Sequence, residues 1–184
     1  MSLAQLWLPI LAATVLVFVA SFVLHAVLQW HKPDYRGFAN EEAVRQAIRA
    51  GNAAPGLYLV PYCDDMKQLR LPEKRRLFEE GPVAFVTLRA PAAPSMGPHL
   101  IRWFLLNLGI TIVAAYIAGK TLAPGASFLQ AARIVGSIGF VAYAAGPIQE
   151  GIWMGKPWGA VGREVVDAIV YAIAMGAAFG WLWH

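Results

Sequence analysis

Four long apolar runs decide what this chain can fold into. They cover approximately Leu3–Trp30, Leu100–Gly119, Phe128–Gly146 and Val161–Trp183. A helix needs about 20 mostly apolar residues to cross the hydrocarbon core of a bilayer, and each run approaches or exceeds that length. Only 14% of the residues are charged, whereas soluble domains carry about 25%. The chain is therefore predicted to be an all-α membrane protein with four transmembrane helices.

The spacing of these runs predicts three segments. Residues 1–30 form transmembrane helix 1, residues 31–98 form an insertion, and residues 99–184 form transmembrane helices 2–4. Short links join the last three helices, so we expect antiparallel neighbours in a four-helix bundle. The first run is too long for the core of a signal peptide, and we interpret it as a retained helix.

The insertion has the start and stop signals of short helices and the composition of strands. "NEEAVRQAIRAG" (40–51) begins with a capping asparagine and ends with glycine, and "PEKRRLFEEG" (72–81) has proline in its first turn. "LYLVPYC" (57–63) and "VAFVTLR" (83–89) are typical of strands. We expect a small α+β unit between helices 1 and 2.

The distribution of basic residues predicts the orientation. The segment 31–98 holds ten of the fifteen Lys and Arg residues, and neither terminus holds any. Basic residues accumulate on the cytoplasmic side of multi-pass proteins. Residues 31–98 are therefore predicted to be cytoplasmic, with the N- and C-termini outside. The lone cysteine, Cys63, would be a reduced thiol there.

Polar side chains gather at the predicted cytoplasmic ends of the helices. This inner-face polar cluster consists of His25, His99, Arg102, Glu164, Asp167 and Tyr171. Ionisable residues inside a membrane are candidates for function by default. The same residues also fit a structural role, because acids in a first helical turn interact favourably with the helix dipole. A structural ion pair and a site for an ion, a proton or a lipid headgroup both remain open.

Asp167 lies deepest among these charges and needs a partner. Arg102 is the expected one, through a pair between helices. Tyr171 follows Asp167 by one turn on the same helix face. An Asp–Tyr pair could relay protons, or it could simply satisfy a buried carboxylate.

The residue spacing does not support a metal site. His25, His31, His99, Cys63 and Asp64 have side chains that suit zinc or another transition metal, but sequential pairs such as HxxxH or CxxC are absent. Two acids follow Cys63, which would raise the pKa of a thiol rather than activate it. We assign no metal, no cofactor and no catalytic residue from the sequence.

The last run carries a row of small residues, namely Ala168, Ala172, Gly176 and Gly180. Small residues every four positions let helices approach closely in lipid. The row could pack against another helix of the same chain, or it could mediate assembly into a homo-oligomer or a larger membrane complex.

Several short motifs resemble those of a family of uncharacterised bacterial four-span integral membrane proteins. They are "EGIWMGKPW", "VVDAIVY" and "GWLW" in the last third of the chain, and "HKPDY" and "LYLVPYC" in the insertion. The resemblance implies four spans and a bacterial inner membrane. It implies no activity and no site residues.

The leading functional hypothesis is a non-enzymatic structural or accessory membrane protein that packs through the small-residue row. The alternative is an oligomeric channel or proton-coupled transporter that uses the polar cluster, and a membrane enzyme comes third. The expected partners are the lipid bilayer and a second copy or another membrane subunit, and no nucleic acid.

Overall fold

The computed structural model describes residues 1–183, apart from the side chain of Met66. It divides into two compact units. One, the helical unit, combines Met1–Arg36 with Ser95–His184, and the other, the insertion unit, is Gly37–Pro94. The segment 31–36 thus belongs to the helical unit, whereas the sequence assigned it to the insertion.

The helical unit contains four long helices: α1 (Trp7–Phe22), which continues into a π-helical turn (Val23–Val27), α4 (Gly97–Thr121), α5 (Phe128–Met154) and α6 (Trp158–Leu182). Each is long and apolar enough to cross a membrane. The prediction of four such helices is confirmed, and the chain is described below as a membrane protein.

The link between α5 and α6 is much shorter than the sequence indicated. Helix α5 starts at a capping box of Ser127 and Gln130, and it ends at Gly155, which adopts φ +69°. Because that left-handed conformation suits glycine, it terminates the helix there. Pro147 is accommodated inside α5, although proline removes one backbone hydrogen bond. Glu150, which was expected in a loop, is therefore part of a helix.

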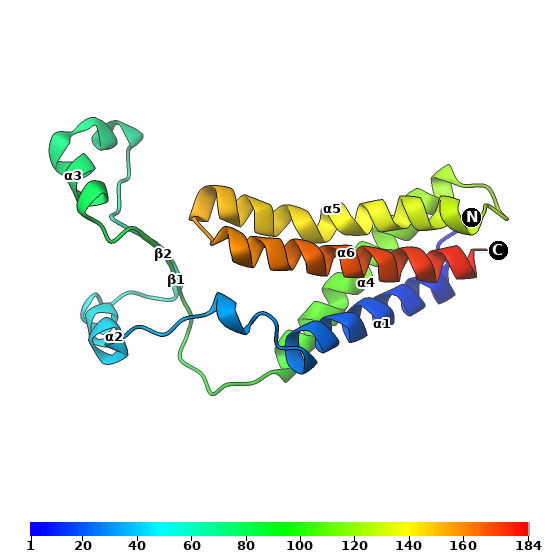
Figure 1. Ribbon diagram of the computed structural model, residues 1–184, viewed down its shortest axis with the longest axis horizontal. Coiled ribbons are helices and arrows are strands. Elements are labelled where there is room, and N and C mark those ends of the chain that lie inside the picture. The colour runs from blue at the N-terminus through cyan, green and yellow to red at the C-terminus, as the bar shows by residue number, and fades with distance from the viewer. Residues whose placement is uncertain (184) are drawn as a thin grey trace. The chain divides into compact units, whose positions relative to one another are not determined.

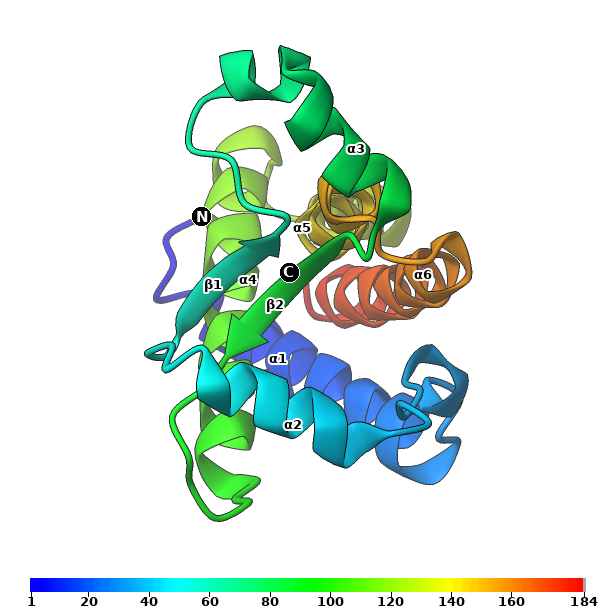
Figure 2. The same cartoon turned by 90° about the vertical axis from the view of Figure 1, so that its left-hand side faces the viewer.

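Helices α5 and α6 lie side by side along their length (Figures 1 and 2). Glycines make this contact close. A Cβ atom on Gly136 would lie 3.2 Å from the carbonyl oxygen of Ala172, and one on Gly176 would lie 2.9 Å from that of Ala132. Gly180 faces the ring of Phe128. The small-residue row therefore packs within the chain, which was one of its two predicted roles.

The core of the helical unit forms where α1 packs against α6 and α4. Its largest fully buried side chains include Leu6 and Val17 from the N-terminal segment and α1, and Met175 and Phe179 from α6. Most other apolar side chains of the four helices stay exposed in the monomer, as expected for surfaces that face lipid.

The insertion unit has the predicted elements: α2 (Glu41–Ala50), β1 (Gly56–Val60), α3 (Pro72–Glu80) and β2 (Ala84–Leu88). The strands pair antiparallel, with Gly56 opposite Leu88. Asn40 caps α2 by accepting a hydrogen bond from the amide of Ala43. None of the side chains described in this unit is fully buried.

The close contact of α5 and α6 predicts that Gly176→Leu destabilises the protein. Overpacking of a tight contact costs about 1–3 kcal/mol, and here the obstacle is backbone of α5. Gly109→Leu is the matched control, because Gly109 in α4 is exposed and has nothing within 4 Å of a built Cβ. Thermal unfolding in mild detergent should show a lower midpoint for Gly176→Leu alone, and equal midpoints would contradict the packing.

Candidate metal centre

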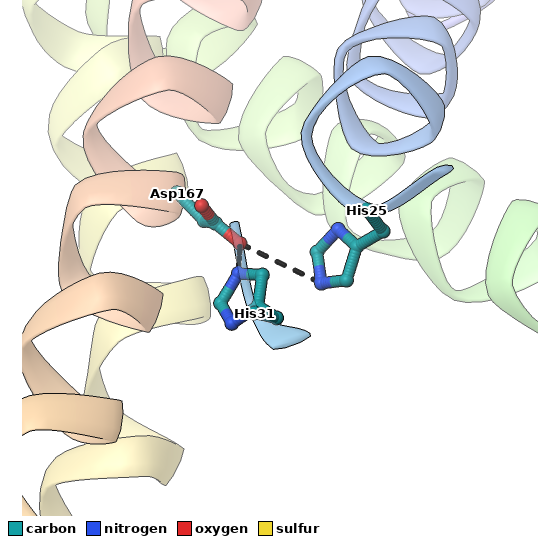
Figure 3. Close-up of side chains that lie close together, drawn as sticks. All are labelled: His25, His31 and Asp167. Carbon is teal, nitrogen blue, oxygen red and sulfur yellow. Dashed lines mark hydrogen bonds and ion pairs between the residues drawn. The ribbon is translucent and has the colours of Figure 1, made fainter. Parts of the chain in front are cut away.

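Three ionisable side chains converge where α1 ends and α6 begins (Figure 3). His25 lies in the π-helical turn, His31 follows in the segment after it, and Asp167 belongs to α6. The chain turns between the two histidines at Gln29, a non-glycine residue with φ +51°. A short 3₁₀ helix (Lys32–Asp34) then holds the segment.

The Asp167 carboxylate is the buried component of this cluster, with only 4% of the residue exposed. Its Oδ1 accepts a hydrogen bond from the indole Nε1 of Trp30 at 3.1 Å. Its Oδ2 lies 2.7 Å from His31 Nε2 and 3.6 Å from His25 Nε2. Because an unpaired buried charge is very costly, these partners allow Asp167 to be buried in the N-terminal half of α6.

The other ring nitrogen of each histidine has its own acceptor. His25 Nδ1 lies 3.1 Å from the backbone carbonyl oxygen of Ser21, and His31 Nδ1 lies 2.8 Å from Asp34 Oδ2. A carbonyl or carboxylate oxygen can only accept, so each Nδ1 carries the proton. Asp167 Oδ2 also only accepts, so its 2.7 Å contact with His31 Nε2 needs a proton on that nitrogen or a cation between the two atoms. His25 Nε2 faces the same oxygen from 3.6 Å and carries a lone pair when the ring is neutral.

This arrangement needs a positive charge between the three groups. Two nitrogen lone pairs and a carboxylate oxygen repel one another unless a proton or a cation lies between them. The rings of His25 and His31 also stack, with centroids 4.4 Å apart and planes 13° apart, so protonating both would place two cations face to face. The three ligand atoms lie within 4.8 Å of one another, which is close enough to share one metal ion.

Asp34 connects this cluster to the first turns of α6. Its Oδ1 accepts a hydrogen bond from Arg163 Nε at 2.8 Å, and the terminal Nη2 of Arg163 also contacts this oxygen. The Arg163 hydrogen bond is the main cause that lowers the pKa of Asp34 below its ordinary 3.8; burial opposes it and the His31 bond adds to it. Asp34 thus remains a carboxylate that orients His31.

A second charged group joins α5 to α6 nearby. Lys156 Nζ donates to Glu150 Oε2 at 2.8 Å and to Glu164 Oε2 at 2.7 Å. Burial alone would lower the pKa of Lys156, but the hydrogen bonds to the two glutamates outweigh it and raise the pKa above its ordinary 10.5. The positive charge of Lys156 is therefore balanced by Glu150 and Glu164.

The structure corrects the expected pairing of Arg102 with Asp167. Arg102 is exposed on α4 and forms none of the ion pairs found among residues 1–183, whereas Asp167 contacts Trp30 and the two histidines. His99 lies in the first turn of α4, outside the three-residue cluster. Tyr171 is buried one turn beyond Asp167, as expected, and Glu164 pairs with Lys156.

Three contributors to the centre were not predicted as such. Neither Trp30 nor Arg163 was a candidate from the sequence, and His31 belonged to a metal set that the spacing did not support. The i,i+3 spacing of His31 and Asp34 around Pro33 was a usable signal, because a 3₁₀ turn places such residues on one side. Cys63 and Asp64 lie in the insertion unit and are not part of the cluster.

No protein-family model, curated protein or solved structure matches the chain. The resemblance to bacterial four-span membrane proteins therefore stays a prediction, and the functional argument rests on the geometry of this centre.

The backbone acceptor at His25 Nδ1 predicts the tautomer of this histidine when its ring is neutral. ¹⁵N spectra of histidine-labelled protein in alkaline buffer should show His25 protonated at Nδ1 and unprotonated at Nε2. Substitution of each histidine in turn assigns the signals, and protein unfolded in denaturant is the control that should lose this preference. A proton on Nε2 of neutral His25 would contradict the described geometry.

Proposed function

We propose that the chain is a four-helix-bundle membrane protein that binds one divalent transition-metal ion through His25, His31 and Asp167. The observation that carries this proposal is the convergence of two Nε2 atoms on one buried carboxylate oxygen, while both Nδ1 atoms are held by acceptors.

The donor set suits zinc or iron(II). Two imidazoles and one carboxylate occur in catalytic zinc sites and in non-haem iron(II) sites, which keep further positions open. Ligands about 2.0 Å from a tetrahedral zinc lie roughly 3.3 Å apart. The His31–Asp167 distance of 2.7 Å and the His25–Asp167 distance of 3.6 Å lie on either side of that value, so small side-chain rotations would accommodate the ion.

The surroundings support metal binding as well. Histidine ligands of metals usually donate their second ring N–H to a carboxylate or a backbone carbonyl. His31 has Asp34 in this role, and His25 has the Ser21 carbonyl. The indole N–H of Trp30 binds the carboxylate oxygen that faces away from the imidazoles, which leaves Oδ2 for the metal.

The membrane setting is proposed from charge and helix length together. The positive-inside rule favours a bacterial inner membrane protein with residues 31–98 in the cytoplasm and both termini outside. The metal centre would then lie at the cytoplasmic end of the bundle, because α1 leads directly into residues 31–36.

Assembly into a complex and proton transport are two further proposals, and fewer contacts support them. Assembly into a homo-oligomer or a larger complex would need a surface other than the small-residue row, since α5 covers part of that row. A proton-coupled channel or transporter would use the chain of hydrogen bonds from Asp34 through His31 to Asp167. The transport hypothesis predicts proton flux into liposomes that contain the protein. A flux equal to that of empty liposomes would contradict it.

Metal binding should be measurable with purified, tag-free protein in detergent. After equilibrium dialysis against Zn²⁺, elemental analysis should find one zinc per chain. His25→Ala and His31→Ala each remove a ligand and should weaken binding by more than about tenfold, and Asp34→Asn should weaken it by about tenfold through the orientation of His31.

His99→Ala is the matched control, because His99 belongs to the helical unit but lies outside the cluster. It should keep the zinc content of the wild type. A wild-type protein without zinc after dialysis, or equal zinc content in all these variants, would contradict the proposal.

The lone cysteine offers a test of the orientation. In intact cells, a membrane-impermeant maleimide should label Cys63 only after the membrane is permeabilised. A Ser2→Cys substitution in a Cys63→Ser background should react without permeabilisation, because the N-terminus is proposed to be outside. The reverse labelling pattern would place the metal centre on the other side of the membrane.

A further inference from the structure

A pocket of about 520 Å³ adjoins the metal centre and is lined by all four long helices. One end is charged and contains His25, Asp167 and Lys156 with its two glutamates, Glu150 and Glu164. The other end is apolar and contains Leu106, Ile110 and Ala142. Such a gradient within one pocket fits an amphipathic molecule, with its polar end toward the metal centre.

Two buried donors in the wall of this pocket have no hydrogen-bond partner. They are the indole Nε1–H of Trp103 and the hydroxyl of Tyr171, which interacts with the Ser21 side chain of the same pocket but forms no hydrogen bond of standard geometry. Tyr171 is only 4% exposed. Tyr143 lies between α4 and α6 in the same wall, but its hydroxyl already donates to Asn107 Oδ1 at 2.6 Å. Since buried donors are normally paired, the two free donors indicate that the pocket receives an acceptor from outside the chain.

The three aromatic rings keep these donors in one place. The ring centroids of Trp103 and Tyr171 lie 6.2 Å apart, and both rings pack on Tyr143 at 6.1 and 5.1 Å. An oxygen atom that accepts from either donor is therefore held against an aromatic wall, which favours the uncharged part of a ligand.

The side chains that line the pocket carry a net negative charge, which disfavours binding of an anionic headgroup. Three carboxylates line the pocket, those of Glu150, Glu164 and Asp167, and its one lysine, Lys156, is already bound to the two glutamates. In the metal-free protein, a phosphate would therefore meet net negative charge and no available cation. An uncharged carbonyl oxygen can accept a hydrogen bond in this pocket without that repulsion.

We propose that this pocket binds a neutral amphipathic molecule through a carbonyl oxygen that accepts hydrogen bonds from Trp103 and Tyr171. The carbonyl could belong to a quinone or to an acyl ester, and these two sources share the recognised chemistry. Binding at this pocket does not require the proposed metal, since neither donor is a metal ligand.

Isothermal titration of the metal-free protein in dodecyl maltoside, a detergent without carbonyl groups, tests this proposal with three probes. They are the short-chain quinone ubiquinone-1, the ester 1,2-dioctanoylglycerol and the anionic 1,2-dihexanoyl phosphatidic acid. At least one neutral probe should bind at one molecule per chain, and more tightly than phosphatidic acid. Binding of ubiquinone-1 alone identifies a quinone site, and binding of dioctanoylglycerol alone identifies an acyl-ester site.

Tyr171→Phe removes one donor with little change in shape and should weaken binding of the neutral probe about fivefold, as expected for the loss of one neutral hydrogen bond. Trp103→Phe removes the other donor together with one ring of the indole, and it should weaken binding at least as much. Tyr116→Phe and Trp153→Phe are the matched controls, because both residues are exposed and lie outside the pocket, and they should bind as the wild type does.

The proposal is overturned if neither neutral probe binds, if phosphatidic acid binds more tightly than both, or if the two donor variants bind like their controls. His31→Ala separates this site from the metal centre, because His31 does not line the pocket. That variant should bind zinc more weakly and keep its affinity for the neutral probe, whereas Tyr171→Phe should keep its affinity for zinc and bind the probe more weakly.

Discussion

The buried carboxylate of Asp167 is the constraint on which this end of the helical unit depends. A charge among apolar helices is stable only when it is paired or solvated. Here the partners come from the segment after α1, through Trp30 and His31. The carboxylate therefore holds that segment against α6, and Asp34 and Arg163 add a second connection between the same two parts of the chain.

The same contacts arrange the proposed metal ligands. His31 is fixed at both ring nitrogens, while His25 is fixed at one nitrogen by its own helix and stacks on His31. A site formed in this way is largely preorganised, because its ligands are oriented by their surroundings before an ion binds. His25 is the exposed ligand, with 49% of its side chain accessible, and the adjoining pocket reaches both it and Asp167.

The fold was predictable from the sequence to the extent that it depends on local signals. Hydropathy and length identified the four long helices, and capping residues such as Asn40 identified the short elements of the insertion. The end of α5 was misplaced because the predicted apolar run ended at Gly146, whereas the left-handed Gly155 ends the helix. The end of α5 depends on the left-handed backbone conformation of Gly155. The presence of a glycine alone does not show that the chain adopts this conformation.

The candidate site was predictable only in part. The depth of Asp167 showed that it needs a partner, but Arg102 was the wrong choice. The actual partners depend on the turn at Gln29, a left-handed residue that is not glycine, so no sequence pattern indicated that the chain returns to α6. Trp30 lies at the end of an apolar run, where tryptophan is common at a membrane interface, so nothing in the sequence indicated its hydrogen bond to Asp167.

X-ray absorption at the zinc K-edge of the metal-loaded protein tests the central claim most directly. The account predicts a first shell of nitrogen and oxygen atoms at about 2.0 Å, with the outer-shell scattering of two imidazole rings and no sulfur. The two-imidazole signal should fall to one ring in His31→Ala. A first shell that contains sulfur, or one without imidazole scattering, would contradict a centre formed by His25, His31 and Asp167.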